Sequence, residues 1–301
     1  MILIFCSDPM NKNAVDVDYE QEYSSAQSLG FMIKLICLEE LLEGNLEKAL
    51  SKISPNTENY VTALYRGWMI KPKYYEDLYN GLKKKNILLI NDPEEYRNGH
   101  WLPNSYDKIK EFTPYSNWIS IENLKNDWSQ IYSNLSQFGN KSIIVKDYVK
   151  SRKHEWHESF YIPDASDRNH AAKVIKNFID RQGDEINEGL VFREFVNLER
   201  ISVHSKSQMP LSKEYRLFYF KNQFLYLFNY WEDSQYDEEI PDLEVFNRLA
   251  QTIGSSFFTM DIGKTFTGDW IVIEIGDGQV SGLPTDSNIL EFYETIKERA
   301  D

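Results

Sequence analysis

The sequence predicts a protein that begins with a parallel α/β domain and continues with antiparallel α+β structure. Two patterns support this prediction. In residues 1–92, short apolar segments alternate with segments of helical spacing, which is typical of a parallel sheet. From residue 141 onward, apolar segments follow one another closely, which is typical of antiparallel hairpins. We place the three predicted domains at residues 1–92, 93–191 and 192–301.

The elements follow in chain order. Apolar strands are expected in the N-terminal domain at residues 1–6, 31–39, 61–70 and 86–92. Helical spacing covers residues 16–30, where Gly30 suits the C-terminal end, and residues 73–85. Residues 93–140 are rich in Tyr, Trp, Asn and Ser and are expected to be helical in pieces. Six further strands are expected at residues 141–149, 189–199, 214–220, 223–231, 256–263 and 270–276, with a helix at 171–183.

Composition excludes several classes of protein. Hydrophobic residues make up 42% of the 301 residues, so a sizeable core is expected rather than disorder. The net charge of -14 disfavours general nucleic-acid binding, which needs surplus Lys and Arg. The first residues lack a basic leader, and no apolar segment is long enough to span a membrane. Two cysteines do not make a disulfide framework or a zinc site. We therefore expect a cytoplasmic protein.

Two acids are expected to face each other across the last hairpin. The strands flank Thr267-Gly268, a plausible tight turn, and Asp261 and Glu274 lie at equal distances from it. Directly opposed side chains have Cβ atoms ~5 Å apart, so these carboxylates would repel each other unless a cation or a shared proton joins them. With Asp277 as a candidate third ligand, they would suit Mg²⁺. The alternative is a solvent-exposed face, where acids are ordinary.

Strict alternation along the second strand of this hairpin has a further consequence. It places Glu274 on the same face as Trp270 and Val272, and Ile271 and Ile273 on the other.

Basic side chains interrupt the apolar strands that precede this hairpin. Lys146 ends one strand and a basic loop, residues 150–153, follows it, while Arg193 and Arg216 lie within two other strands. Each needs an anionic partner, because burying an unpaired charge is costly. That partner is either a structural Asp or Glu or, with the acidic hairpin nearby, a phosphate shared with a metal.

The order of these elements resembles the ATP-grasp superfamily. A strand with a lysine is followed by a hinge strand, an E-x-R strand, an Asp strand and a Glu strand. The segments VKDYVKSRKHEW, FREFV, MPLSKEYRLF and IEIGDGQVSGLP resemble the clade of this superfamily named for two arginines and one lysine. FCSDP, YRGWM and INDPEEYRNGHWLP resemble that clade's leading domain. The resemblance implies an ATP-grasp fold, in which two antiparallel α+β subdomains enclose the nucleotide.

The resemblance also implies roles for single residues in nucleotide binding. Lys146 matches the lysine that contacts the phosphates, and Lys153 lies in the loop that covers them. Many relatives have a glycine-rich loop there, whereas this chain has charged side chains. The hinge that reads the adenine edge matches Glu194, Phe195 and Val196. The acid that holds the ribose matches Glu214.

The clade's two arginines match Arg193 and Arg216, which would lie near the transferred phosphate together with Lys153. The Mg²⁺ ligands match Asp261 and Glu274, and Mn²⁺ is a possible substitute. Many relatives carry Asn two residues after that Glu. This chain has Gly276 there, so Asp277 is the best candidate for a third ligand.

ATP-grasp enzymes resemble one another in joining a carboxylate to an amine or similar nucleophile through an acyl phosphate. We therefore expect an ADP-forming, ATP- and Mg²⁺-dependent ligase that acts on small-molecule or peptide substrates. Two alternatives remain open: an ATP-binding assembly chaperone or regulatory protein that binds a protein partner without turnover, and a phosphotransferase. No nucleic-acid or membrane partner is expected.

Four other features are expected to have ordinary roles. His154 and His157 do not match a zinc motif and belong to a polar loop or contact substrate. Asp8 either contacts substrate at a strand end or caps a turn. The acidic segment 231–244 is a solvated loop or a lid over the site. Trp156 is expected in the core or at a rim rather than as a stacking platform.

Overall fold

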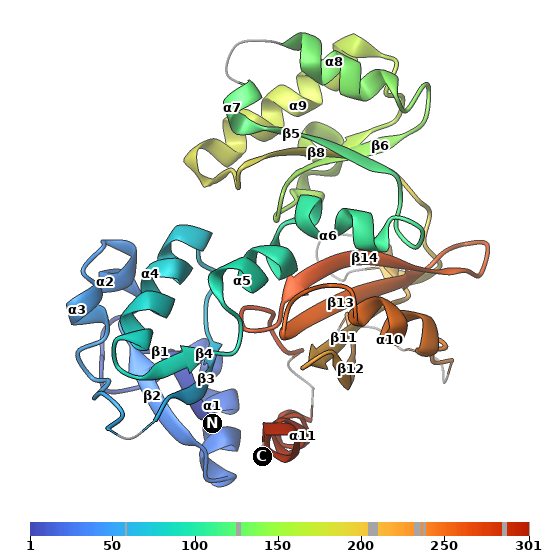
Figure 1. Ribbon diagram of the computed structural model, residues 1–301. Helices are drawn as coiled ribbons and strands as arrows, with labels where there is room; N and C mark the ends of the chain where they lie inside the picture. Colours follow the sequence, from blue (N-terminus) through green and yellow to red (C-terminus); the bar gives the residue numbers. More distant parts are fainter. Residues whose placement is uncertain are drawn as a thin grey trace.

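A computed structural model describes residues 1–57, 59–124, 128–203, 210–231, 236, 239–284 and 288–300. Figure 1 shows three groups of elements: an N-terminal unit, a central sheet with its helices, and a C-terminal sheet. The first sheet is parallel and the two later four-stranded sheets are antiparallel. The predicted fold class is confirmed.

The N-terminal unit contains the four predicted strands in the order β2-β1-β3-β4. Gly30, with φ at 78°, follows α1 as expected. The second predicted strand is shorter than expected because residues 38–42 form a helix. In chain order the elements are β1 (Ile2–Cys6), η1 (Val17–Tyr19), α1 (Glu20–Ser28), β2 (Met32–Ile36), α2 (Leu38–Leu42), α3 (Leu46–Ala49), β3 (Val61–Arg66), α4 (Pro72–Lys83) and β4 (Ile87–Leu89).

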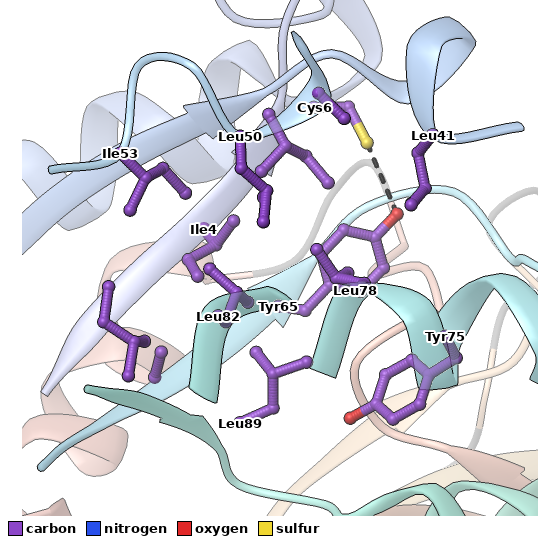
Figure 2. Close-up of a cluster of buried hydrophobic side chains, with 14 of the residues drawn as sticks. Ile4, Cys6, Leu41, Leu50, Ile53, Tyr65, Tyr75, Leu78, Leu82 and Leu89 are labelled. Atoms are coloured by element: carbon purple, nitrogen blue, oxygen red, sulfur yellow. Dashed lines mark hydrogen bonds between the residues drawn. The ribbon is translucent and has the colours of Figure 1, made fainter. Parts of the chain in front are cut away.

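One face of this sheet packs against α4 in a core of buried hydrophobic side chains (Figure 2). Ile4 and Tyr65 from neighbouring strands and Leu78 and Leu82 from α4 are fully buried. The Tyr65 hydroxyl and the Cys6 thiol are 3.3 Å apart and share a hydrogen bond, which satisfies both polar groups inside the core.

Two helices, α5 (Pro93–His100) and α6 (Leu102–Ile109), lead from this unit to the central sheet. Asp92 caps α5: its carboxylate accepts hydrogen bonds from the N–H groups of Glu94 and Glu95, and the Glu95 carboxylate accepts one from the N–H of Asp92. The helical pieces predicted here are confirmed.

The central sheet has the order β5-β8-β6-β7. Its edge strand β5 was not predicted, because its sequence SNWIS has neither alternation nor an apolar run; pairing with β8 holds it in place. The elements are β5 (Ser116–Ser120), α7 (Ile121–Leu124), α8 (Trp128–Ser136), β6 (Ile143–Asp147), η2 (Lys153–Glu155), η3 (Trp156–Phe160), β7 (Tyr161–Ile162), α9 (Arg168–Gln182), η4 (Gly183–Glu185) and β8 (Gly189–Glu194).

The C-terminal sheet has the order β12-β11-β13-β14 and lies next to a small β9–β10 pair. The last helix, α11, returns to the N-terminal unit, where the Tyr293 hydroxyl donates to Glu22 of α1 over 2.5 Å. Within the described ranges, no helix is long and apolar enough to cross a membrane. The elements are β9 (Arg200–Val203), β10 (Pro210–Ser212), β11 (Glu214–Phe220), β12 (Gln223–Asn229), α10 (Glu244–Ala250), β13 (Phe257–Lys264), β14 (Trp270–Asp277) and α11 (Ile289–Ala300).

One predicted domain boundary falls between two elements, and the other falls inside a strand. The boundary after residue 92 lies between β4 and α5, whereas the boundary after residue 191 lies inside β8. Residues at the end of β8 therefore belong to the central sheet, and α11 packs on the N-terminal unit. The division of the chain into three domains stays a prediction.

Replacing Gly189 by Ala is expected to destabilise the fold. An added Cβ would meet the carbonyl oxygen of Ile119 and would lie 2.7 Å from the Tyr148 ring. Forcing atoms into such a site costs about 1–3 kcal/mol, measurable as a lower urea midpoint at an unchanged slope. Gly282→Ala is the matched control, because its added Cβ would meet nothing within 4 Å. Equal midpoints for the two variants would contradict the close approach of β8 to β5.

Candidate functional site

A cavity of about 250 Å³ lies between the central and C-terminal sheets. Most of the residues predicted for the site line it: Lys146, Lys153, Arg193, Glu194, Phe195, Val196, Glu214, Asp261 and Glu274. Arg216 and Asp277 are not among its lining residues. Strands from both sheets thus place cations and acids around one space.

The two predicted acids are direct partners in the β13–β14 register. Asp261 accepts two hydrogen bonds from Arg216, from Nε and from Nη2, each over 2.8 Å. Glu274 accepts one from the Lys146 ammonium over 2.5 Å. Burial favours the neutral form of Glu274, but the nearby cations, Lys146 foremost, together outweigh burial and lower the pKa of that carboxyl below its usual value. The cations thus offset the repulsion between the acids.

The prediction from strict alternation is wrong for β14. Asp261 pairs with Glu274 but Ile262 pairs with Val272, so Ile273 is an extra residue, a β-bulge. As a result, Val272 is buried in the core with Ile275, while Ile273 lines the cavity beside Glu274.

The structure does not bring Asp277 to the acidic pair. Its side chain is fully buried, and it accepts hydrogen bonds from Asn91 Nδ2 over 2.6 Å and from the N–H of Gln279 over 2.9 Å. Burial raises the pKa of Asp277 to about 7. In the part of the chain that is described, no group of three His, Cys, Asp or Glu side chains converges as a metal site. Asp277 instead joins β14 to the N-terminal unit.

Arg193 links the two sheets across the cavity. From β8 its guanidinium donates to the carbonyls of Ile273, over 2.5 Å, and Val272, over 3.0 Å, and to Thr113 Oγ1 over 2.7 Å. These acceptors are all neutral, and burial lowers the pKa of Arg193 to about 10. The side chain therefore stays charged at neutral pH beside the cavity.

Lys153 is the cation of the basic loop that reaches the cavity. Its ammonium lies 4.6 Å from the Trp231 ring centroid and 5.2 Å from that of Tyr230. The Trp231 indole N–H donates to Glu214 Oε1 over 3.1 Å. Arg152 instead pairs with Glu155 over 2.6 Å. The rest of the predicted acidic segment includes residues 232–235 and 237–238, which lie outside the described residues.

The hinge after β8 forms one end of the cavity. The N–H groups of Glu194 and Phe195 bind the carbonyls of Tyr115 and Ser142, over 2.8 and 2.9 Å. The Glu194 carboxylate pairs with Lys141 over 2.8 Å. The N–H groups of Glu194 and Phe195 are therefore already used within the fold, and a ligand at this segment would have to bind its other backbone groups.

Comparison with known proteins agrees with this arrangement. Residues 137–296, more than half of the chain, match the family model for the ATP-grasp domain, family 3 of the clade named for two arginines and one lysine. The chain belongs to this ATP-grasp family. The matched span contains every residue of the predicted site, from Lys146 to Asp277.

Solved structures show that the ATP-grasp fold covers the whole chain. A RimK domain ATP-grasp protein from Sphaerobacter thermophilus has a TM-score of 0.61 at 12% identity, over 99% of this chain and 98% of that chain. D-alanine–D-alanine ligase from Bacillus anthracis has 0.57 at 15%, over 99% and 96%. The ATP-grasp ligase PsnB, complexed with minimal precursor, Mg and ADP, has 0.57 at 10%, over 99% and 97%. No curated protein matches the chain.

Sequence reasoning missed part of this ATP-grasp cavity. Trp156 lines it, with its ring stacked 5.3 Å from that of Tyr161 and edge-on at 5.6 Å to that of Phe195. Trp231 and Tyr230 line it beside Glu214. Trp156 lies three residues after the basic loop at 150–153, and Trp231 begins the acidic segment 231–244, for which a lid over the site was one of the two predicted roles.

His154 and Asp8 have ordinary surroundings. The His154 side chain is 67% exposed and has Glu155 at 3.7 Å. The Asp8 carboxylate accepts hydrogen bonds from the N–H groups of Met10 and Asn11, over 2.8 and 2.7 Å. Asp8 thus holds a turn, which was one of the two predicted roles.

Stability should fall with rising pH because of Glu214. Burial raises the pKa of this carboxyl from 4.5 to about 7. Between these two pH values the Glu214 carboxyl is protonated in the folded chain but ionised in the unfolded chain. The stabilisation that this carboxyl gives to the folded state is therefore fully present below pH 4.5 and is lost as pH rises through 7. The loss is at most about 3 kcal/mol. The raised pKa of Asp277 should likewise lower the free energy of unfolding as pH rises.

Urea unfolding at pH 5 and pH 7.5 would measure this decline. Glu214→Gln should reduce it, because the amide does not ionise. The exposed Glu111, replaced by Gln, is the control and should leave the decline unchanged. A decline identical in Glu214→Gln and the wild type would show that Glu214 is not protonated in the folded chain.

Proposed function

We propose that this protein is an ATP- and Mg²⁺-dependent ligase that forms ADP and joins a carboxylate to an amine or similar nucleophile. The observation that carries the proposal is the cavity between the two sheets, where Lys146, Lys153 and Arg193 surround the opposed acids Asp261 and Glu274. Cations and acids around one cavity suit a nucleotide whose phosphates are shared with a metal.

The acidic pair fits Mg²⁺ by its chemistry. Asp261 and Glu274 are neighbouring carboxylates that face the same space, and hard divalent cations prefer such oxygen ligands with phosphates completing the shell. When bound, Mg²⁺ would neutralise charge on the phosphates. Arg216 holds Asp261 through two hydrogen bonds, so we assign it a positioning role rather than contact with substrate.

The remaining residues would bind and orient the reactants. Lys146 and Lys153 would contact the phosphates, and Arg193 would stabilise charge on the transferred group. A substrate carboxylate oxygen would attack the terminal phosphorus and release ADP. The nucleophile would then attack the acyl carbon of this acyl phosphate and release inorganic phosphate. The chain's residues align and neutralise charge, which is most of what phosphoryl transfer requires.

The hinge and its aromatic neighbours would hold the nucleoside. The base would lie near Phe195, Val196 and Trp156, which line the same end of the cavity. Glu214 would take the ribose hydroxyls in place of the Trp231 N–H that it accepts in this structure. The substrate is either a peptide or a small molecule. Among the solved relatives, PsnB is complexed with a precursor and D-alanine–D-alanine ligase carries its substrate in its name.

Calorimetry of ATP binding with and without Mg²⁺, followed by an assay of products against pooled metabolites and peptides, tests the proposal. A ligase yields ADP and phosphate in equal amounts only when acceptors are present. A phosphotransferase yields ADP and a phosphorylated product without free phosphate. Mg²⁺-dependent binding with no turnover against any pool would favour an ATP-binding assembly or regulatory protein. No binding at all would overturn the nucleotide site.

A further inference from the structure

A second cavity, of about 210 Å³, lies in the N-terminal unit at the carboxyl ends of β1 and β2. It shares no lining residue with the cavity between the sheets. Ligands of α/β proteins commonly bind at this edge of a parallel sheet. Ser7 follows β1 and Cys37 follows β2, which is the neighbour of β1 in the sheet; both line the cavity.

The Ser7 hydroxyl is an unsatisfied polar group in the wall of this cavity. The residue is 2% exposed, and its Oγ has no hydrogen-bond partner among the residues that the structure describes. Its N–H is used in the sheet, where it donates to the carbonyl of Ile36 over 2.8 Å. Buried hydroxyls are nearly always hydrogen-bonded in native proteins. A group inside the cavity would supply the missing partner.

Three lysines and one acid, Glu40, line the same cavity in a protein of net charge -14. The Lys12 ammonium is paired with Glu39 over 2.6 Å, and the exposed Lys48 lies 3.8 Å from Glu40. The Lys52 ammonium donates to two neutral acceptors, the Lys12 carbonyl and Asn13 Oδ1.

These contacts leave Lys52, which is exposed, as a cation at the cavity whose two acceptors are neutral oxygens. A carboxylate or phosphate group would complement its charge, and would accept a hydrogen bond from the buried hydroxyl as well.

We propose that this cavity binds a small anion, carrying a carboxylate or phosphate group, between Ser7 and Lys52. The site is separate from the nucleotide site and does not depend on the proposed ligase activity. Its size suits one small molecule or one charged end of a larger one.

Cys37 provides a local readout that the nucleotide site does not affect. It lines this cavity and is partly exposed, whereas Cys6, the only other cysteine of the sequence, is fully buried. Alkylation of the intact protein by iodoacetamide, a neutral reagent, should therefore report on this cavity. Inorganic phosphate or acetate should slow the reaction, by about threefold at twice the dissociation constant. Chloride at equal ionic strength should not.

Variants decide whether the protection arises at the proposed site. Lys52→Met and Ser7→Ala should each abolish protection, while Lys84→Met, which removes a charge from an exposed position of the same unit, should keep it. Lys146→Met should also keep it, because Lys146 lines only the other cavity.

The probes also separate the two possible ligand classes. Protection by phosphate alone would assign a phosphorylated ligand, and protection by acetate alone a carboxylate. Equal alkylation rates with phosphate, acetate and chloride would overturn the proposal, as would protection that survives Lys52→Met. The outcome is independent of ATP binding, so failure here and failure of the proposed function are distinguishable.

Discussion

Replacing Asp261 by Asn together with Glu274 by Gln is expected to abolish Mg²⁺-dependent ATP binding. The two carboxylates are register partners and line the same cavity, so the double variant removes both proposed metal ligands while nearly conserving shape. Loss of groups that only support a metal ligand costs about 10–100-fold in affinity, so loss of both direct ligands should cost more than about 100-fold. Calorimetry with ATP at several Mg²⁺ concentrations measures the effect.

The structure also predicts a cost in stability for this double variant. Arg216 loses the charge of its partner at a site where Asp261 is only 5% exposed, and removal of one member of a buried pair costs about 3–5 kcal/mol. The Lys146–Glu274 pair should contribute less, since the Glu274 side chain is 38% exposed. A loss of binding could then reflect partial unfolding, so a matched variant is needed.

Glu22→Gln supplies this control. Glu22 pairs with the buried Arg66 of β3 over 2.9 Å, outside the cavity, and is 7% exposed. This variant should lose comparable stability but keep Mg²⁺-dependent ATP binding. If the double variant bound ATP with undiminished Mg²⁺ dependence, the acids would be structural partners of Arg216 and Lys146 and the metal assignment would fail.

The strands of the site could be predicted from sequence because their signals are local. Lys146, Arg193 and Glu274 each interrupt an apolar segment. The predicted pairing of Asp261 with Glu274 is observed, but the register next to the turn, Lys264 with Trp270, is one residue off that of a Thr267-Gly268 turn, and the bulge at Ile273 restores the pairing. Such features depend on residues near one another along the chain.

The features that were missed depend on contacts distant in sequence. Asp277 is held by Asn91, 186 residues away, and nothing near Asp277 indicates that partner. The bulge at Ile273 arises where two registers meet along β14, and a hydropathy pattern does not show a one-residue insertion.

Arg193→Lys is expected to reduce product formation by about 100-fold or more, the usual loss when one preorganised donor to developing charge is removed. Lysine keeps the positive charge, but one ammonium lacks the planar fork that reaches Ile273, Val272 and Thr113 together. ATP affinity should fall less than turnover, because Lys146 and Lys153 still line the cavity. Turnover of the most active substrate pool and calorimetric affinity measure the two effects separately.

Arg193 could act on the transferred phosphate or hold β14 and Glu274 in place, and Thr113→Val separates these two roles. The Thr113 hydroxyl accepts from Arg193 and donates to the Val272 carbonyl over 2.8 Å, so its loss loosens the link between the sheets but leaves the guanidinium beside the cavity. If Arg193 acts on the transferred phosphate, Thr113→Val should cost only about tenfold, the lower end of the effect of one hydrogen bond to a charged group. Equal losses in the two variants would mean that Arg193 acts by holding β14 and Glu274 in place. Full activity of Arg193→Lys would exclude both roles.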